Sequence, residues 1–171
     1  MARAILEAMD GGGETLIQIV DRALADAIRR SGAWLACRPG CCECCMGPFP
    51  ITREDAERLR HALTELECHD SGRAARIRSR AEAWRGGDDE PCPVLDPDAG
   101  TCELYAARPL TCRTFGPPVR CASGALAVCE LCFDGATEGQ INACVVDLDP
   151  SVLEQAGEEE LTVAAALHSP A

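Results

Sequence analysis

Cysteines are the residues of this sequence with the clearest chemistry. The chain of 171 residues contains 13 cysteines, and most of them lie in two segments. The first segment reads Cys37-Arg-Pro-Gly-Cys41-Cys42-Glu-Cys44-Cys45. The second segment contains Cys92, Cys102, Cys112, Cys121, Cys129, Cys132 and Cys144. Soft thiolate ligands select zinc, iron–sulfur clusters or cuprous copper, so the pattern predicts a thiolate metal site and not a site for a hard ion such as magnesium.

The first cysteine segment lies in a predicted loop, because glycines and prolines interrupt any helical pattern over residues 37–50. Two neighbouring residues in extended backbone point to opposite faces. The sulfurs of Cys44 and Cys45 are therefore expected to serve two metal ions, or one ion and a hydrogen-bonded neighbour. More than one metal ion, or a polynuclear cluster, is expected beside this loop.

Structural roles are the alternative for some of the cysteines. A reduced cysteine is also a small core residue, and this is the role that we expect for Cys68 and Cys144. Cys42, Cys121 and Cys132 are left open between a core role and a ligand role. A disulfide framework is disfavoured, because the number of cysteines is odd and the N-terminal sequence does not read as a secretory signal peptide.

Composition and charge exclude several classes of function. All 16 basic residues are arginines, which excludes Schiff-base lysine chemistry and a P-loop lysine. The net charge is −12, and nucleic-acid affinity depends on neutralising phosphates, so nucleic acids and anionic membranes are not expected partners. No segment reaches the roughly 18 apolar residues of a membrane span. We expect a cytoplasmic protein whose thiols stay reduced.

The expected fold class is mainly α, with helices packed around the loops that carry the metal site and little or no β-structure. Apolar residues recur at helical spacing in 14–36, in a helix that begins after the N-cap residue Thr52, and in 72–85. Between 88 and 134 the prolines and glycines leave room only for short elements. These short elements are a turn over 96–100, a helical turn over 104–108 and a small hairpin around 123–124, and two further helices are expected over 137–146 and 150–168.

The domain organisation follows from the length, since domains commonly contain about 100–200 residues. We expect a single domain over 1–171. Within it lie an N-terminal helix at 14–36, a cysteine-rich metal-binding core at 37–134 and an acidic helical C-terminal segment at 135–171.

Several short motifs together resemble a bacterial family of zinc- or iron-chelating domains known as the YkgJ-type or CxxCxxCC family. The resemblance covers roughly residues 33–134. The motifs are Gly40-Cys41-Cys42-Glu43-Cys44-Cys45, Pro91-Cys92-Pro93-Val94-Leu95, Cys102-Glu103-Leu104-Tyr105, Arg108-Pro109-Leu110, Cys112-Arg113-Thr114-Phe115 and Cys129-Glu130-Leu131-Cys132-Phe133.

The resemblance implies a set of eight metal-ligating cysteines. They are Cys37, Cys41, Cys44, Cys45, Cys92, Cys102, Cys112 and Cys129. The sequence departs from the family pattern at several places: Cys37 lies one residue further from Cys41, Val94 stands where phenylalanine is usual, and Cys42 and Cys132 are additional.

Our first hypothesis is that the protein holds iron, in an iron–sulfur or polynuclear site, through the CxxxCxxCC loop and the CP-x8-C-x9-C segment. The expected role is redox or catalytic, with a protein or redox partner. The alternatives are a structural zinc-binding protein or interaction module, and a metal carrier or store. Arg108 and Arg113 flank Cys112 and are candidates to donate hydrogen bonds to thiolates. Tyr105 is expected to pack with a polar tip. The oligomeric state is left open.

Overall fold

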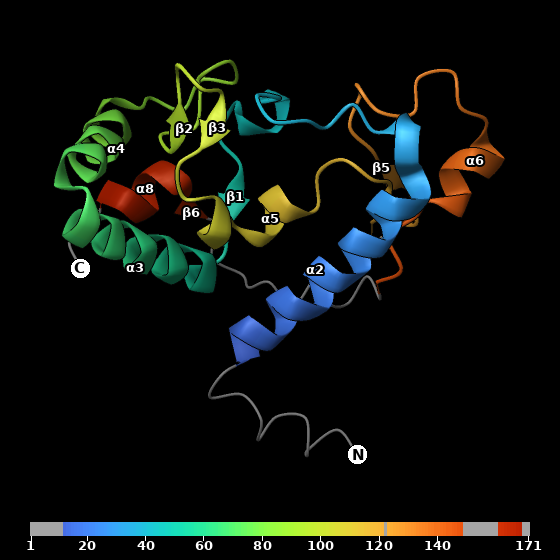
Figure 1. Ribbon diagram of the computed structural model, residues 1–171, viewed down its shortest axis with the longest axis horizontal. Helices are drawn as coiled ribbons and strands as arrows, with labels where there is room; N and C mark the ends of the chain where they lie inside the picture. The colour runs from blue at the N-terminus through green and yellow to red at the C-terminus, as the bar shows by residue number, and fades with distance from the viewer. Residues whose placement is uncertain (1–11, 122, 149–160, 169–171) are drawn as a thin grey trace. The chain divides into compact units, whose positions relative to one another are not determined.

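Helices account for most of the regular structure in this protein. The computed structural model describes residues 12–121, 123–148 and 161–168 (Figure 1). Within these residues the β-structure is limited to three two-stranded antiparallel sheets. The expected mainly α fold with little β-structure is confirmed. No helix in the described ranges is long and apolar enough to cross a membrane.

The chain divides into two compact units, each of which is described by itself. Unit 1 comprises Met1–Ala36 and Arg113–Gln155, and unit 2 comprises Cys37–Cys112 and Ala156–Ala171. The metal-binding core expected over 37–134 therefore contributes residues to both units. The expectation of a single domain stays a prediction.

Unit 2 contains most of the short elements of the chain. In chain order they are η3 (Glu43–Cys45), β1 (Pro50–Ile51), α3 (Arg53–His69), α4 (Ser71–Ala83), β2 (Leu95–Asp96), β3 (Thr101–Cys102), η4 (Tyr105–Ala107), α5 (Leu110–Arg113, which ends in unit 1), β6 (Leu161–Thr162) and α8 (Val163–His168).

Helix α3 begins where the sequence predicts. The Thr52 side chain accepts a hydrogen bond from the Asp55 N–H, and the Asp55 carboxylate accepts one from the Thr52 N–H. This reciprocal capping box satisfies backbone donors that the first helical turn leaves without partners. Along the helix Ala56, Leu59 and Leu63 are buried, as their helical spacing requires.

Helices α3, α4 and α8 enclose the main hydrophobic core of unit 2. The core contains Ile51, Ala56, Leu59, Leu63, Ala74, Ile77, Ala81, Val94, Leu104, Val163, Ala166 and Leu167. Strand β1 pairs with β6, which immediately precedes α8, so the C-terminal segment is tied to the beginning of α3. Cys92 and Cys102 pack against this core from the side of the β2–β3 hairpin.

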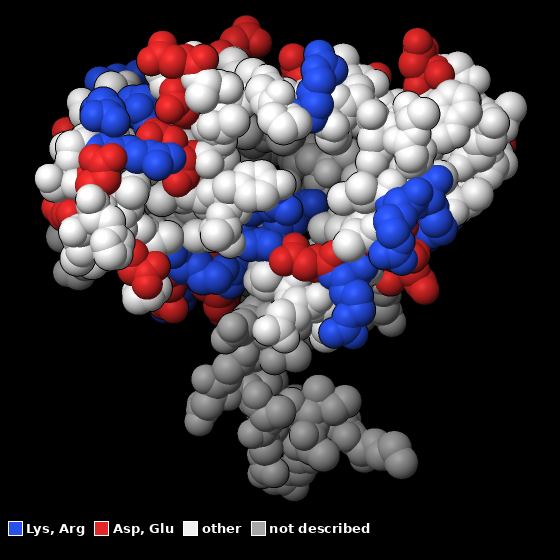
Figure 2. Space-filling model, viewed as in Figure 1, with Lys and Arg blue, Asp and Glu red and all other residues white. Residues whose placement is uncertain are grey.

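The surface over α3 and α4 carries charges of both signs (Figure 2). Arg78 of α4 pairs with Glu67 of α3 at 2.7 Å between Nη2 and Oε2, and both side chains are partly exposed. Exposed pairs of this kind contribute about 0–1 kcal/mol to stability. The apolar core therefore stabilises the packing of these two helices more than the ion pair does.

Unit 1 is built on α2 (Gly12–Ser31), which continues into η2 (Gly32–Trp34). The buried residues Val20, Leu24 and Ala27 form the apolar stripe of this helix. The other elements of the unit are β4 (Val119–Arg120), β5 (Leu126–Ala127) and α6 (Glu138–Ala143).

Two arginines tie α2 to the rest of unit 1. Arg30 donates hydrogen bonds to the carbonyls of Ala143 and Val145, and the Val145 contact is 2.9 Å long. Arg113 Nη1 lies 2.7 and 2.6 Å from the two carboxylate oxygens of Asp21. Arg113 is buried, so this ion pair holds α2, and the expected role of the guanidinium beside a thiolate stays a prediction.

The three longest helices agree with the prediction apart from their ends. The helix expected over 14–36 gives way to a 3₁₀ turn at Gly32, whose φ is +50°, a conformation that glycine adopts readily. Helix α4 ends at Ala83, two residues before the predicted end at 85. Of the helix expected over 150–168, residues 150–160 lie outside the described residues. Leu161–Thr162 form strand β6, paired with β1, so the prediction is wrong there, and α8 occupies only Val163–His168.

Candidate metal centre

The loop that carries Cys44 and Cys45 is held against the segment that carries Cys92. The Cys92 N–H donates to the Cys45 carbonyl at 2.7 Å, and the Gly47 N–H donates to the Glu90 carbonyl at 2.9 Å. Between these two bonds Met46 forms an antiparallel bridge with Pro91. The two cysteine motifs, which are far apart in the sequence, therefore lie side by side.

The β2–β3 hairpin brings Cys102 to the same place. Cys102 pairs with Leu95 in the hairpin, and the Glu103 N–H donates to the Val94 carbonyl at 2.8 Å. The turn between the strands is closed by Asp96, whose carboxylate accepts hydrogen bonds from the N–H groups of Asp98 and Ala99. Asparagine and aspartate side chains stabilise turns in this way.

Helix α5 adds Cys112 and is anchored by a buried carboxylate. Asp55 is fully buried, and its Oδ1 accepts a hydrogen bond from the Leu110 N–H at 3.1 Å. Thr111 Oγ1 donates to the Pro50 carbonyl at 3.0 Å. These contacts dock the first turn of α5 on the start of α3, so the capping residue of one helix also positions a cysteine of the next.

Five thiols of unit 2 form what we call the thiol cluster. Its members are Cys44, Cys45, Cys92, Cys102 and Cys112. The Cys44 thiol shares a hydrogen bond with the Cys45 thiol, and it interacts electrostatically with each of the other three. All five side chains are partly buried.

The environment of the cluster favours neutral thiols while no metal is bound. The hydrogen bond with Cys45, together with burial, raises the pKa of Cys44. Burial raises the pKa of Cys92 to about 11, and burial with the neighbouring thiols raises the pKa of Cys112 to about 12. Burial also raises the pKa of Cys102. A metal ion that binds thiolates here must displace protons.

Two arginines oppose these shifts. Arg108 lowers the pKa of Cys44 and of Cys102, and Arg80 lowers the pKa of Cys92, although burial outweighs both. Arg108 was expected to act beside the thiolates, and its position agrees with that expectation. Its guanidinium also stacks on the Tyr105 ring, 4.0 Å from the ring centroid. Tyr105 is 62% exposed, so the expectation that it packs into the protein is wrong.

The thiol cluster is not a preformed chelate. Across the ranges that the structure describes, no three His, Cys, Asp or Glu side chains are grouped as ligands of one metal ion.

The prediction that the sulfurs of Cys44 and Cys45 point to opposite faces is wrong. It assumed extended backbone, but Glu43–Cys45 forms a 3₁₀ turn closed by a hydrogen bond from the Cys45 N–H to the Cys42 carbonyl at 2.8 Å. The two thiols share a hydrogen bond and do not point to opposite faces. Cys44 and Cys45 can therefore bind the same metal ion. The expectation of more than one metal ion then depends only on the number of thiols.

The remaining predicted ligands lie outside the contacts of the thiol cluster described above. Cys37 is exposed and Cys41 is half-buried on the loop that leads into η3. Cys129 belongs to unit 1, where it packs against Cys132, Phe133 and Cys144. The role of all eight cysteines as ligands stays a prediction.

Among the other cysteines, the two assigned to the core differ. Cys144 is buried as expected, whereas Cys68 is exposed near the end of α3, so its expected core role is wrong. Cys42 is half-buried, Cys132 is buried and Cys121 is exposed.

Three positioning residues were missed by the sequence analysis: Asp55, Arg80 and Glu103. The bond of Asp55 to Leu110 joins residues 55 positions apart. The Glu103 side chain is only 3% exposed and pairs with Arg73 and Arg80 of α4. The motif beginning at Cys102 includes Glu103, but nothing in the sequence indicates which arginines it meets.

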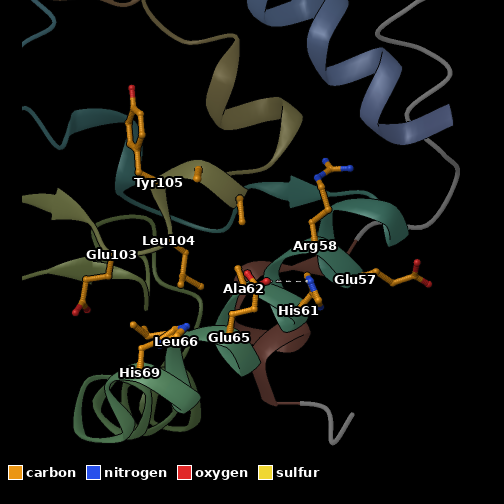
Figure 3. A pocket seen from close by; sticks show the side chains of 12 residues that line it. Glu57, Arg58, His61, Ala62, Glu65, Leu66, His69, Glu103, Leu104 and Tyr105 are labelled. Carbon is orange, nitrogen blue, oxygen red and sulfur yellow. Dashed lines mark ion pairs between the residues drawn. The ribbon is translucent and has the colours of Figure 1, made fainter. Parts of the chain in front are cut away.

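A groove runs along α3 beside the segment that follows Cys102 (Figure 3). It encloses about 800 Å³. Glu103, Leu104 and Tyr105 lie on one side, and α3 contributes His61 and Glu65, which form an ion pair with 3.4 Å between Nε2 and Oε1.

The metal-free chain is expected to lose stability as the pH rises above about 9. The ordinary pKa of a cysteine is 9.0, and burial raises the pKa of Cys92 to about 11 and that of Cys112 to about 12 in the folded state. The folded state binds these protons more tightly than the unfolded state does. Their contribution to the free energy of unfolding is therefore complete below the unfolded pKa, and it is lost as the pH rises to the folded pKa. Denaturant titrations of the metal-free chain at about pH 8 and about pH 10 measure this loss. A stability that is unchanged or higher at the upper pH contradicts the prediction, and Cys112→Ser is expected to reduce the slope.

Replacing Gly100 by alanine is expected to displace the loop that leads into the thiol cluster. Gly100 has φ +63°, and an added Cβ would lie 3.1 Å from the Gly40 carbonyl oxygen and 3.3 Å from the Gly40 Cα. Gly124 is a matched control, since it has φ +82° and nothing within 4 Å of its Cβ position. Both substitutions incur the left-handed penalty of about 1–2 kcal/mol.

Only Gly100→Ala adds the backbone contact, so it is expected to weaken metal affinity as well as stability. A competition titration with a chelator, run on both variants, measures the difference. Equal metal affinity in the two variants contradicts the expectation.

Comparison with known proteins agrees with this arrangement of cysteines. A family model named CxxCxxCC and described as "Putative zinc- or iron-chelating domain" matches residues 36–132, which is more than half of the chain. Neither the curated proteins nor the solved structures yielded a match. The matched region contains the whole thiol cluster and Cys37, Cys41 and Cys129. The chain belongs to the CxxCxxCC family of zinc- or iron-chelating domains.

Proposed function

We propose that this protein chelates iron at the thiol cluster, in a polynuclear iron–thiolate or iron–sulfur centre. The observation that carries the proposal is the convergence of five thiols from the η3 loop, the segment before β2, the β2–β3 hairpin and α5. A closed structural zinc site uses four protein ligands. Five thiols, with Cys37 and Cys41 on the adjoining loop, exceed that number.

The donor set fits such a centre. Half-buried thiols are soft ligands that favour iron–sulfur clusters or zinc over hard ions. The fixed positive charges of Arg80 and Arg108 lie within electrostatic range of the cluster and offset part of the negative charge that thiolates bring. When bound, an iron–sulfur cluster supplies one-electron transfer at a potential set by hydrogen bonds to sulfur and by solvent exposure.

The chain's own residues hold the thiols and limit their contact with water. The β2–β3 hairpin and the hydrogen bond from the Leu110 N–H to the Asp55 carboxylate fix the backbone beside Cys102 and Cys112. In this proposal the protein acts in the cytoplasm, where thiols are kept reduced, and a protein partner exchanges electrons with the centre.

A structural zinc site is the second candidate, and a specific observation favours it. Cys44, Cys92, Cys102 and Cys112 interact electrostatically with one another, and four thiolates are the ligand set of a closed tetrahedral zinc site. Such a site leaves no open position for catalysis, so the protein would then be an interaction module. A carrier or store of metal is a third role, and it requires release of the ion to an acceptor.

Elemental analysis and a visible spectrum of protein purified without oxygen test the proposal. Iron with acid-labile sulfide and broad visible absorption is expected for an iron–sulfur centre. Iron with thiolate-to-iron absorption but no sulfide supports the polynuclear iron–thiolate form. A colourless protein that contains zinc contradicts the proposal and supports the structural site. Transfer of the bound ion to a metal-free acceptor protein distinguishes a carrier.

A further inference from the structure

A buried ion-pair group joins α4 to the chain beside the thiol cluster. The Glu103 carboxylate is 3% exposed and lies between two arginines of α4. Arg73 Nε donates to Glu103 Oε1 at 2.7 Å, and Arg80 Nη2 pairs with Glu103 Oε2. A buried carboxylate is unfavourable unless it is paired and hydrogen-bonded. The two arginines therefore hold the Glu103 side chain, in addition to the hydrogen bond from its N–H to the Val94 carbonyl.

The Arg80 guanidinium has a second partner on another segment. Its Nε donates to the Pro93 carbonyl at 2.7 Å while its Nη2 binds Glu103. Pro93 follows Cys92 in the chain, and Glu103 follows Cys102. One side chain thus holds the immediate neighbours of two members of the thiol cluster.

We propose that Arg80 is a positioning residue of the metal centre, which fixes Cys92 and Cys102 relative to one another by binding Pro93 and Glu103 at once. The inference rests on the proposed function, since it concerns the same thiols. One peptide unit separates Pro93 from Cys92 and Glu103 from Cys102. A shift of the Pro93 carbonyl, or of the Glu103 backbone through its held carboxylate, therefore moves the thiol beside it. Groups outside the first ligand shell orient metal ligands in this way.

The planar fork of arginine matters for this role. A guanidinium presents several donors in fixed directions, whereas the lysine ammonium is a compact charge on a flexible stem. Lysine at position 80 retains the positive charge but does not reproduce both contacts. Arg80→Lys is therefore expected to displace the thiols as much as Arg80→Met does, although it preserves the positive charge.

The test starts from the full chain without metal. Co²⁺ or Zn²⁺ is then added as the probe ion. Arg80→Lys and Arg80→Met are compared with Arg78→Lys and Arg78→Met, because Arg78 lies on the same helix and pairs only with the partly exposed Glu67 among the contacts described above. Metal affinity is measured by competition with a chelator. The visible spectrum of the Co²⁺ form reports the arrangement of the thiolates.

The Arg80 variants are expected to bind metal roughly 10–100-fold more weakly than the wild type and to change the Co²⁺ spectrum. The Arg78 variants are expected to stay within about twofold of the wild type, because exposed ion pairs contribute little. Arg80 variants whose affinity and spectrum match those of the Arg78 variants overturn the inference. A wild-type chain that binds neither ion overturns the proposed function itself, so the two failures are distinguishable.

Loss of folding is separated from loss of positioning by two further variants. Ile77→Val weakens the buried face of α4 without removing a partner of Pro93 or Glu103, and it is expected to lower the thermal midpoint with the Co²⁺ spectrum unchanged. Glu103→Gln retains the shape of the side chain but removes its charge. This variant is expected to show a changed spectrum even where its metal-free chain melts as cooperatively as the wild type. An unchanged spectrum in folded Glu103→Gln and Arg80→Lys overturns the inference.

Discussion

Serine in place of Cys92 or Cys112 is expected to lower metal affinity by about 100- to 1,000-fold. Structural zinc in small peptides supplies roughly 10–16 kcal/mol of apparent binding free energy. If four thiolates share this energy, each contributes about 2.5–4 kcal/mol, and about 1.4 kcal/mol corresponds to a tenfold change. Both cysteines lie within the electrostatic contacts of the thiol cluster. A serine hydroxyl is a much poorer ligand than a thiolate for the soft ions that such sites select.

The matched control for this experiment is Cys68→Ser. Cys68 is an exposed cysteine on α3, in the same unit of the chain but outside the thiol cluster. It is expected to retain the wild-type stoichiometry and affinity when both are measured by chelator competition and elemental analysis. If Cys92→Ser and Cys112→Ser bind metal as tightly as Cys68→Ser, then the cluster is not the binding site.

Removal of the metal is expected to lower the thermal midpoint by about 5–10 °C under moderate loading. At a free metal concentration of about 100 times Kd, binding adds about 2.7 kcal/mol to stability. In a chain of 150–250 residues each kcal/mol shifts Tm by about 2–4 °C. Calorimetry of the loaded and fully metal-free chain measures the shift, and an unchanged midpoint contradicts it.

The loss of stability after metal removal is expected to be uneven along unit 2. The apolar core between α3, α4 and α8 includes no member of the thiol cluster among its fully buried residues. Hydrogen exchange is therefore expected to accelerate in residues 37–50 and 88–112, while α3 and α4 remain protected. In unit 1, α2 has its own contacts through Arg30 and Arg113 and is expected to stay helical. Uniform acceleration over α3 and α4 contradicts this expectation.

The helices were predictable from sequence because their signals are local. The capping residue Thr52 and the apolar spacing of Ala56, Leu59 and Leu63 are properties of neighbouring residues, and the structure agrees with both. The change to a 3₁₀ turn after α2 was less visible, because Gly32 within a helical pattern indicates an end only weakly.

The arrangement of the candidate site was only partly predictable. Motif spacing identified the cysteines, and the structure brings five of the eight into one cluster. The error over Cys44 and Cys45 arose because a loop sequence does not specify whether its backbone is extended or turned. The contacts of Asp55 with Leu110, and of Arg80 with Pro93, join residues that no periodic pattern relates. Such contacts depend on tertiary packing, so sequence reasoning alone does not reveal them.

Metal K-edge X-ray absorption of the loaded protein tests the central claim most directly, whether the bound ion is iron or zinc. The claim is that the thiolates of the thiol cluster hold the ion. The expected result is a first coordination shell of sulfur atoms, at about 2.3 Å if the ion is zinc. The Cys92→Ser variant is expected to lose both the metal and this sulfur shell. A first shell made of nitrogen and oxygen at about 2.0–2.2 Å would show that other residues hold the ion and would contradict the account.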